Sequence, residues 1–230
     1  MHKYSFVNMK LREIFTFFLA CFLTMEAYAD ITLDATYTNK EGAEISTQTN
    51  FSEEAPLQVH FSFDLSQLPE GAIYVWHIRN RVTGTNLTRY EQEIDFEFTE
   101  AGLTEVTLEV LVDDEVVDSG TIGVTITESF LEMPNAFSPN GDQTNDVYRA
   151  KQKTLKSIVE FHAYIFNRHG QKLYEWHDVH GGWDGTYNGH PVKDGVYYAY
   201  VKARGADGKD YEFRRDVNLL RNKNTIETTE

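Results

Sequence analysis

After the first thirty residues, apolar and polar positions alternate along much of the chain. Apolar side chains stand at every second position in four segments: 59–65, 94–98, 106–112 and 122–126. A period of two, with one apolar and one polar face, is typical of strands in an antiparallel sheet. Turn sequences such as "LPEG", "VTGTN" and "TEAG" separate the segments. About seven strands in roughly 100 residues predict a β-sandwich.

Two aromatic residues are expected in the core of this sandwich. Trp76 lies in the apolar segment "IYVWHI", and Phe96 lies on the apolar side of "EIDFEFT". The order of a Trp-bearing strand followed by "FTEAGLTEVTLEV" resembles a PKD or Ig-like domain. The "FGDG" sequence that often follows the Trp strand in such domains is replaced here by "HIRNR".

The second half of the chain also predicts strands. Segments rich in β-branched and aromatic residues cover 158–166, 172–176, 195–204 and 211–220. Asp194-Gly195 and Asp207-Gly208 suit tight turns that need a positive φ. No segment carries a helical stripe of apolar residues longer than two turns. The predicted fold is therefore all-β: two consecutive Ig-like antiparallel β-sandwiches after a cleaved signal peptide.

The N-terminus has the three parts of a secretory signal. Lys10 and Arg12 are followed by an apolar run over 14–23 and then by Ala27-Tyr28-Ala29. This pattern predicts a signal peptide over residues 1–29, cleaved at an A-x-A site. The only cysteine, Cys21, lies within it. The alternative is that Cys21 becomes a lipidated N-terminus, and the sequence leaves that alternative open.

Charge divides the remaining chain in two. The formal net charge is −15, which argues against a nucleic acid partner. Residues 30–131 hold 4 Lys+Arg and 20 Asp+Glu. Residues 132–222 hold 13 Lys+Arg and 12 Asp+Glu. This shift predicts an acidic PKD/Ig-like domain over 30–131, a second β-sandwich domain over 132–222 and a tail over 223–230.

Five sequence blocks in the second half carry a family resemblance. They are "PNAFSPNGDQTND" (134–146), "IFNRHGQKLYEW" (165–176), "GGWDGTYNG" (181–189), "DGVYYAYVKA" (194–203) and "VNLLR" (217–221). In this order they resemble the gliding-motility-associated C-terminal domain. That domain is the type B sorting domain of proteins exported by the type IX secretion system of Bacteroidetes.

The resemblance implies a route and partners. The chain would cross the inner membrane by its Sec signal peptide, pass through the periplasm and end outside the cell or on the outer cell surface. Recognition would be by the type IX outer-membrane translocon, and a PorP/SprF-like outer-membrane protein is a further partner that it allows. The sorting residues that it implies are Asn135, Asn140, Gly141, Asp142, Asn145, Asp146, Asn167, Arg168, Gly170, Trp183, Asp184, Gly185, Gly195, Tyr197, Leu220 and Arg221.

A purely structural interpretation of these residues competes with recognition. Asn, Asp and Gly form turns in which short polar side chains bond nearby backbone amides, and Trp183 is a candidate core residue. Two positions depart from the family pattern: Gln143 stands where the family usually has Gly, and His169 stands where it usually has Trp.

The sequence offers candidate calcium and zinc ligands but does not predict a metal site. Asn140, Asp142 and Asp146 are evenly spaced oxygen donors, so weak calcium binding over 140–146 stays open, although no bidentate Glu follows at the EF-hand offset. His177, Asp178, His180 and His190 are candidate zinc ligands, but they lie in what is predicted to be a loop. The prediction is therefore no cofactor and no metal.

The function predicted from the sequence is a non-enzymatic secreted or cell-surface protein. No G-x-S-x-G motif is present, and removal of the signal leaves no cysteine. One alternative is an adhesin whose first domain binds a glycan or protein ligand. Another is an accessory subunit of the gliding or secretion apparatus.

Overall fold

The computed structural model describes residues 31–64 and 71–221 of the 230-residue chain. The predicted signal peptide, Cys21, the tail and Leu65 lie outside the described residues. Every regular element in the two described ranges is a β-strand, so the all-β prediction is confirmed. In the same ranges there is no helix with the length and apolar character needed to cross a bilayer.

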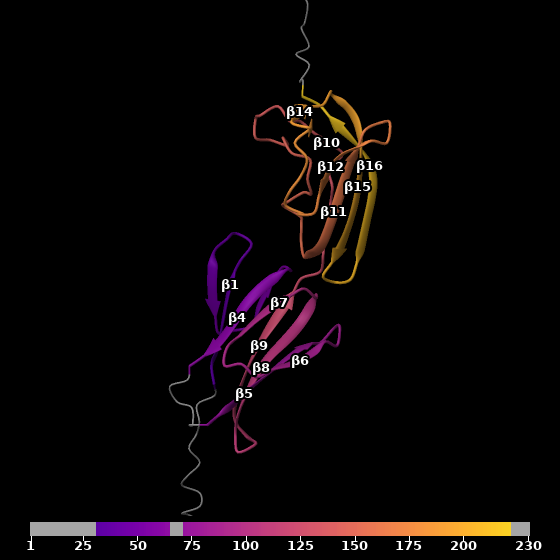
Figure 1. Ribbon diagram of the computed structural model, residues 1–230. Coiled ribbons are helices and arrows are strands. Elements are labelled where there is room, and N and C mark those ends of the chain that lie inside the picture. Colours follow the sequence, from indigo (N-terminus) through magenta and orange to yellow (C-terminus); the bar gives the residue numbers. More distant parts are fainter. Residues whose placement is uncertain (1–30, 65–70, 222–230) are drawn as a thin grey trace, which may run out of the picture.

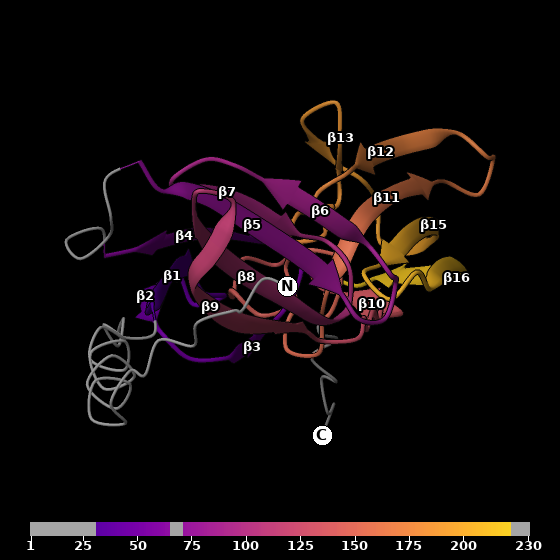
Figure 2. The same cartoon turned by 90° about the horizontal axis from the view of Figure 1, so that it is seen from below.

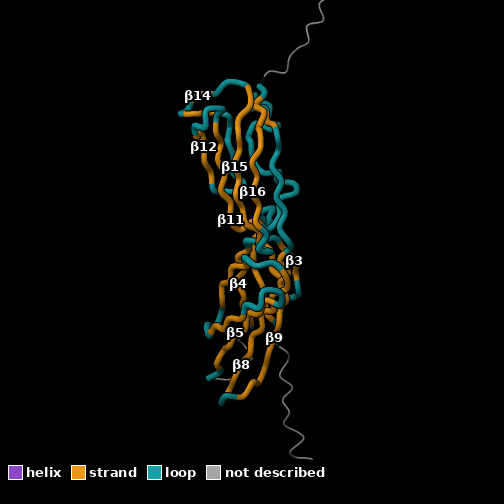
Figure 3. Tube along the Cα trace, turned by 90° about the vertical axis from the view of Figure 1, so that its right-hand side faces the viewer, coloured by secondary structure: helices purple, strands orange, loops and turns teal. Residues whose placement is uncertain are grey.

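The strands form two lobes that are stacked end to end (Figures 1 and 3). The N-terminal lobe comprises residues 31–126, and the C-terminal lobe comprises residues 131–221. Strands of the N-terminal lobe are β1 (Leu33–Thr38), β2 (Glu44–Thr47), β3 (Phe51–Glu53), β4 (Leu57–Phe63), β5 (Ile73–Asn80), β6 (Asn86–Arg89), β7 (Ile94–Phe98), β8 (Gly102–Val112) and β9 (Glu115–Ile126).

The N-terminal lobe is a sandwich of two sheets, which Figure 2 shows from the side opposite the C-terminal lobe. One sheet has the order β2-β1-β4-β7 and the other the order β3-β9-β8-β5-β6. The indole ring of Trp76 on β5 lies 6.3 Å from the ring of Phe61 and 6.0 Å from that of Phe63, both on β4. Aromatic contacts between the sheets therefore fill the core. All pairings are antiparallel except the one between β3 and β9, which is parallel.

Alternation along the strands predicts burial well, with one correction. Trp76, Phe61 and Phe98 are almost fully buried, and the Trp76 indole N–H donates to the carbonyl of Glu91 over 2.9 Å. Phe96, predicted as core, is only partly buried against the core. β7 is an edge strand that pairs with β4 alone, and Phe96 lines an open pocket of 190 Å³ together with Leu87 of β6.

The C-terminal lobe is built on one five-stranded sheet of order β10-β16-β15-β11-β12. Its strands are β10 (Ala136–Phe137), β11 (Ile158–Phe166), β12 (Lys172–Trp176), β13 (Thr186–Tyr187), β14 (His190–Pro191), β15 (Gly195–Gly205) and β16 (Asp210–Leu219). The four strands predicted from the sequence here match β11, β12, β15 and β16 within one residue at either end. The short β10 pairs with β16 in parallel.

The second layer of this lobe consists mainly of loops, drawn in teal in Figure 3. The β13–β14 hairpin and the connections on either side of it cover one face of the sheet. Aromatic rings join the layers: the rings of Phe137 and Trp183 lie 5.4 Å apart, and those of Tyr148 and Trp176 lie 6.5 Å apart. Because the covering segments are rich in turn-forming residues, they pack through side chains rather than through a second ladder.

The junction between the lobes is held by hydrogen bonds. Ser129, which is buried, donates from its hydroxyl to Asp207 over 2.7 Å and from its backbone N–H to the same carboxylate over 3.1 Å. The Tyr211 hydroxyl donates to the Ser129 carbonyl over 2.9 Å. Gly205 permits this approach, because a Cβ there would stand 2.0 Å from the Ser129 hydroxyl oxygen.

Contacts from both lobes continue beyond the junction. The N–H of Ala55 donates to the Ser157 hydroxyl over 3.1 Å, and the N–H of Ala101 donates to the Ala206 carbonyl over 2.9 Å. Ala206 itself packs into the core of the N-terminal lobe. The division into domains 30–131 and 132–222 stays a prediction, and these contacts indicate that the two parts are firmly joined.

We expect the junction to weaken in acid. Burial raises the pKa of Asp207, but hydrogen bonds from Ser129 and Lys209 outweigh it and set the pKa below the ordinary 3.8. A depressed pKa means that the stabilising effect is complete above that ordinary value and is lost as the pH falls through the lower folded value. Thermal unfolding of wild type and Asp207→Asn from about pH 7 to about pH 2 checks this. Below about pH 4, wild type should lose more stability than Asp207→Asn does. Parallel curves of stability against pH for the two proteins would contradict this expectation.

Candidate recognition surface

The loop over 138–146 is organised by one carboxylate. Asp146 accepts hydrogen bonds from the backbone N–H groups of Asn140 and Gly141, both over 2.8 Å, and from that of Gln143 over 2.7 Å. Asp142 accepts from the N–H of Thr144 over 2.8 Å. These oxygens are the ones that a calcium ion would need, and backbone donors occupy them instead. The geometry therefore favours the turn-forming interpretation of this loop.

Backbone conformation explains the residue types in this loop. Gly141, Gln143 and Asn145 have φ values of 83°, 66° and 55°. This left-handed region is readily occupied by Gly and tolerated by Asn, and it is costly for other residues. Gln143, at the position where the resembling family usually has Gly, thus takes a φ that Gly would occupy at lower cost.

Removal of the Asp146 carboxylate should open the loop. Asp146→Ala leaves three backbone N–H groups without their acceptor, and we expect a loss of about 1–3 kcal/mol. Hydrogen exchange at Asn140, Gly141 and Gln143 should accelerate more than in Asp142→Ala, the matched control. Equal acceleration in the two variants would show that Asp146 does not organise the loop.

Arg221 ties the end of the last strand to two neighbouring segments. Its backbone N–H donates to Asp194 over 2.7 Å, and its guanidinium forms an ion pair with the same carboxylate over 3.1 Å. The guanidinium also donates to the carbonyl of Gly185 over 2.8 Å and to that of Val192. The sequence predicted a tight turn at Asp194-Gly195, but it did not predict Asp194 as a site residue.

Trp183 is a core residue beneath these segments. It is fully buried, its indole N–H donates to the Thr186 carbonyl over 2.7 Å, and its ring lies 5.1 Å from that of Tyr197. Asp184 accepts from both the N–H and the hydroxyl of Thr186, which makes a tight turn. The Tyr197 hydroxyl donates to the Lys193 carbonyl over 2.7 Å, and burial raises the pKa of this hydroxyl.

The turn between β11 and β12 has the same character. The Asn167 side chain accepts from the N–H groups of His169 and Gln171 over 2.9 and 3.1 Å. Gly170 takes a φ of 79°. The Gln171 side chain donates to the Tyr187 hydroxyl over 3.0 Å, which links the turn to the β13–β14 hairpin. Arg168 remains exposed at the tip.

Chain topology brings the predicted sorting residues to one end of the molecule. β11 and β16 both run away from the junction, and β15 begins where β16 ends (Figure 1). The end of the C-terminal lobe opposite the junction, here called the free end, therefore collects the loop 138–146, the turn 167–170, residues 183–185, the start of β15 and residues 220–221. Asn135 lies just before β10, where its carbonyl accepts from the N–H of Asn218 over 2.9 Å.

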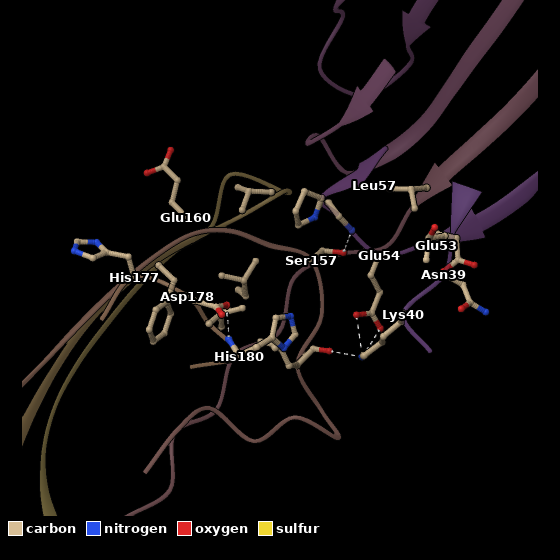
Figure 4. A pocket seen from close by; sticks show the side chains of 18 residues that line it. Asn39, Lys40, Glu53, Glu54, Leu57, Ser157, Glu160, His177, Asp178 and His180 are labelled. Carbon is tan, nitrogen blue, oxygen red and sulfur yellow. Dashed lines mark hydrogen bonds and ion pairs between the residues drawn. The ribbon is translucent and has the colours of Figure 1, made fainter. Parts of the chain in front are cut away.

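The histidines considered as zinc ligands do not come together. A cavity of 400 Å³ lies between the lobes and is lined by residues that include His177, Asp178 and His180. Figure 4 shows the rings of His177 and His180 pointing in different directions. His180 contacts the Gln152 side chain over 2.6 Å, and His190 lies on the distant hairpin strand β14.

Comparison with known families identifies the C-terminal lobe. Residues 131–214 match the CHU_C type IX secretion signal domain, which confirms the family resemblance. The block over 217–221 lies beyond the matched residues. No curated protein matches the chain in sequence.

Several solved structures are similar to this chain at low scores. Latent PorU from Porphyromonas gingivalis matches with 10% identity and a TM-score of 0.26 over 82% of this chain, which spans 20% of the PorU chain. A tetra-tandem repeat from the extending region of a large adhesion protein matches with 9% identity and a TM-score of 0.28, over 85% of this chain and 68% of its own. The FN1-FN3 domains of chicken CNTN1 match with 8% identity and a TM-score of 0.25, over 81% of this chain and 76% of the CNTN1 chain. These scores are too low to inform function.

Proposed function

We propose that this protein is a non-enzymatic cargo of the type IX secretion system, with residues 132–222 as its sorting domain and residues 30–131 as its passenger. The signal domain matched at residues 131–214 supports export by that system, contact with its machinery and a final place on the cell surface or outside the cell. The proposal includes export from the cytoplasm through a Sec signal peptide. It also includes two partners, the type IX outer-membrane translocon and a PorP/SprF-like protein.

One observation carries the proposal beyond the family match. Five separate segments of the C-terminal lobe meet at the free end, and Asp146, Asn167 and Arg221 hold three of them by hydrogen bonds to backbone groups. A folded signal that another protein must recognise requires a surface of defined shape. The free end provides such a surface and faces away from the passenger.

Charge reversal at the free end tests this proposal. Arg168→Glu changes an exposed side chain at the tip of the β11–β12 turn, so the fold should be kept. Lys153→Glu is the matched control, because it reverses an exposed charge in the loop near the junction. We expect Arg168→Glu to accumulate in the periplasm of the native host and Lys153→Glu to be exported normally. Equal export of the two variants would show that the β11–β12 turn is not part of the recognition surface.

A second candidate function is ligand binding by the outer face of the C-terminal sheet. An open groove of 440 Å³ there is lined by Phe166, Tyr198 and Tyr200 together with Arg214. The Arg214 guanidinium lies 5.2 Å from the centre of the Tyr200 ring. Flat aromatic rings of this kind stack on sugars and on proteins. A glycan array with the whole protein, compared with Tyr198→Ala, would test the sugar alternative, and an array without signal would reject it.

A further inference from the structure

Three potential metal ligands meet on the outer face of the C-terminal sheet. They are His162 on β11, Glu175 on β12 and His177 just after β12, and one donor atom from each lies within 4.8 Å of the others. The Glu175 carboxylate oxygen lies 2.8 Å from the Nε2 of His162 and 3.6 Å from the Nε2 of His177. The two imidazole rings are 3.9 Å apart.

Strand pairing fixes this arrangement. Ala163 pairs with Trp176 and Tyr164 pairs with Glu175 in the antiparallel ladder between β11 and β12. Because side chains alternate across a strand, the residues on either side of the buried Ala163 and Trp176 point to the outer face. Continuing the register places His162 beside His177. The positions of His162 and Glu175 are thus set by hydrogen-bonded backbone, and His177 directly follows the last residue of β12.

Outer contacts orient two of the three side chains. The Nδ1 of His162 lies 3.1 Å from the Tyr164 hydroxyl, so the ring can bond there while Nε2 faces Glu175. The second oxygen of Glu175 accepts from the Lys172 ammonium, which leaves the first oxygen toward the histidines. Ligands in metal sites are characteristically held by partners of this kind. His177 is the most exposed of the three, with 67% of its side chain accessible.

We propose that His162, Glu175 and His177 form a binding site for a divalent transition metal ion, with zinc as the best fit. Two imidazole nitrogens and one carboxylate oxygen are a known zinc ligand set. Donor atoms about 2.1 Å from a tetrahedral ion stand about 3.4 Å apart, close to the spacings around Glu175. A rotation of the exposed His177 ring completes the geometry.

The site has room for a fourth ligand. Three protein ligands leave one tetrahedral position for water or for a donor group of another molecule. The neighbouring Tyr164 ring stacks 6.1 Å from the Tyr200 ring, which lines the groove on the same face. An ion held here would stand beside that groove. The inference does not depend on the export function.

Zinc titration of the tag-free protein by calorimetry tests the site. We expect saturable binding of one ion by these residues, weakened about tenfold or more in His162→Gln and in His177→Gln, since loss of a ligand should cost at least as much as loss of an outer partner. His190→Gln is the matched control and should bind as wild type does. Because His177 is exposed, its variant should fold normally, and circular dichroism checks this.

Cobalt gives an independent readout. The intense visible absorption of tetrahedral Co²⁺ should appear on addition to wild type and be lost in His177→Gln. Absence of saturable zinc binding would overturn the proposal, and so would equal affinity in wild type, His162→Gln and His177→Gln, because the ion would then be held elsewhere on the surface.

Discussion

Replacement of Trp183 by alanine is expected to lower the free energy of unfolding by about 3–5 kcal/mol, the usual cost of truncating a buried aromatic side chain. Trp183 has no exposed surface, and its ring packs against those of Phe137 and Tyr197. Its loss also leaves the Thr186 carbonyl without the indole donor. Both the cavity and the unpaired acceptor destabilise the layer beneath the free end.

Urea unfolding followed by circular dichroism measures this effect. Tyr198→Ala is the control, because Tyr198 is an aromatic residue of the same lobe whose side chain is 44% exposed. It should cost less than about 1 kcal/mol. A loss below about 1 kcal/mol for Trp183→Ala would mean that this residue is not part of the core and that the covering loops are packed differently.

A single methyl group at Gly185 is expected to have the second large effect. Gly185 and Gly189 have nearly equal φ values of 80° and 77°, so Ala at either position should carry a similar strain of about 1–2 kcal/mol. Only at Gly185 would the new Cβ also lie close to other groups: 2.9 Å from the Arg221 guanidinium, 3.0 Å from Pro139 and 3.1 Å from Leu219. At Gly189 nothing lies within 4 Å.

The pair of variants therefore separates crowding from backbone strain. Gly185→Ala should cost about 1–3 kcal/mol more than Gly189→Ala, as is typical when an atom is forced into packed surroundings. The two free energies of unfolding, measured under the same conditions, give the difference directly. Equal losses would show that Arg221 and its neighbours can move aside, and that the free end is less rigid than its hydrogen bonds indicate.

Local patterns predicted the strands well because alternation and turn chemistry are local properties. Segment 158–166 was read from its own residues, and β11 has those bounds. Phe96 shows the limit of such reading, because an edge strand has the same alternation as a central one. The strand order and the pocket beside Phe96 depend on residues distant in sequence, and they place the middle of β7 at the edge of the core.

The chemistry of the sites depended more on long-range contacts. Asn140, Asp142 and Asp146 were identified as a loop of turn formers, but only the folded geometry shows that Asp146 is the acceptor for three N–H groups. The junction residue Ser129 bonds to Asp207, 78 positions away, and composition cannot reveal such a pair.

The proposed metal site shows the same limit. His177 was considered together with its neighbours in sequence, whereas the structure places it beside His162 on the adjacent strand. His162 was not considered from the sequence, although it lies within the predicted strand over 158–166. What the sequence lacked was the register between β11 and β12, which sets the residue that lies opposite.

The central claim, that this chain is exported by type IX secretion, is tested most directly by locating the full-length protein in its native host with and without a functional type IX translocon. We predict that the protein lies outside the cell or on its outer surface when the translocon works and accumulates in the periplasm when it does not. The same location in both strains, whether periplasmic or external, would contradict the claim.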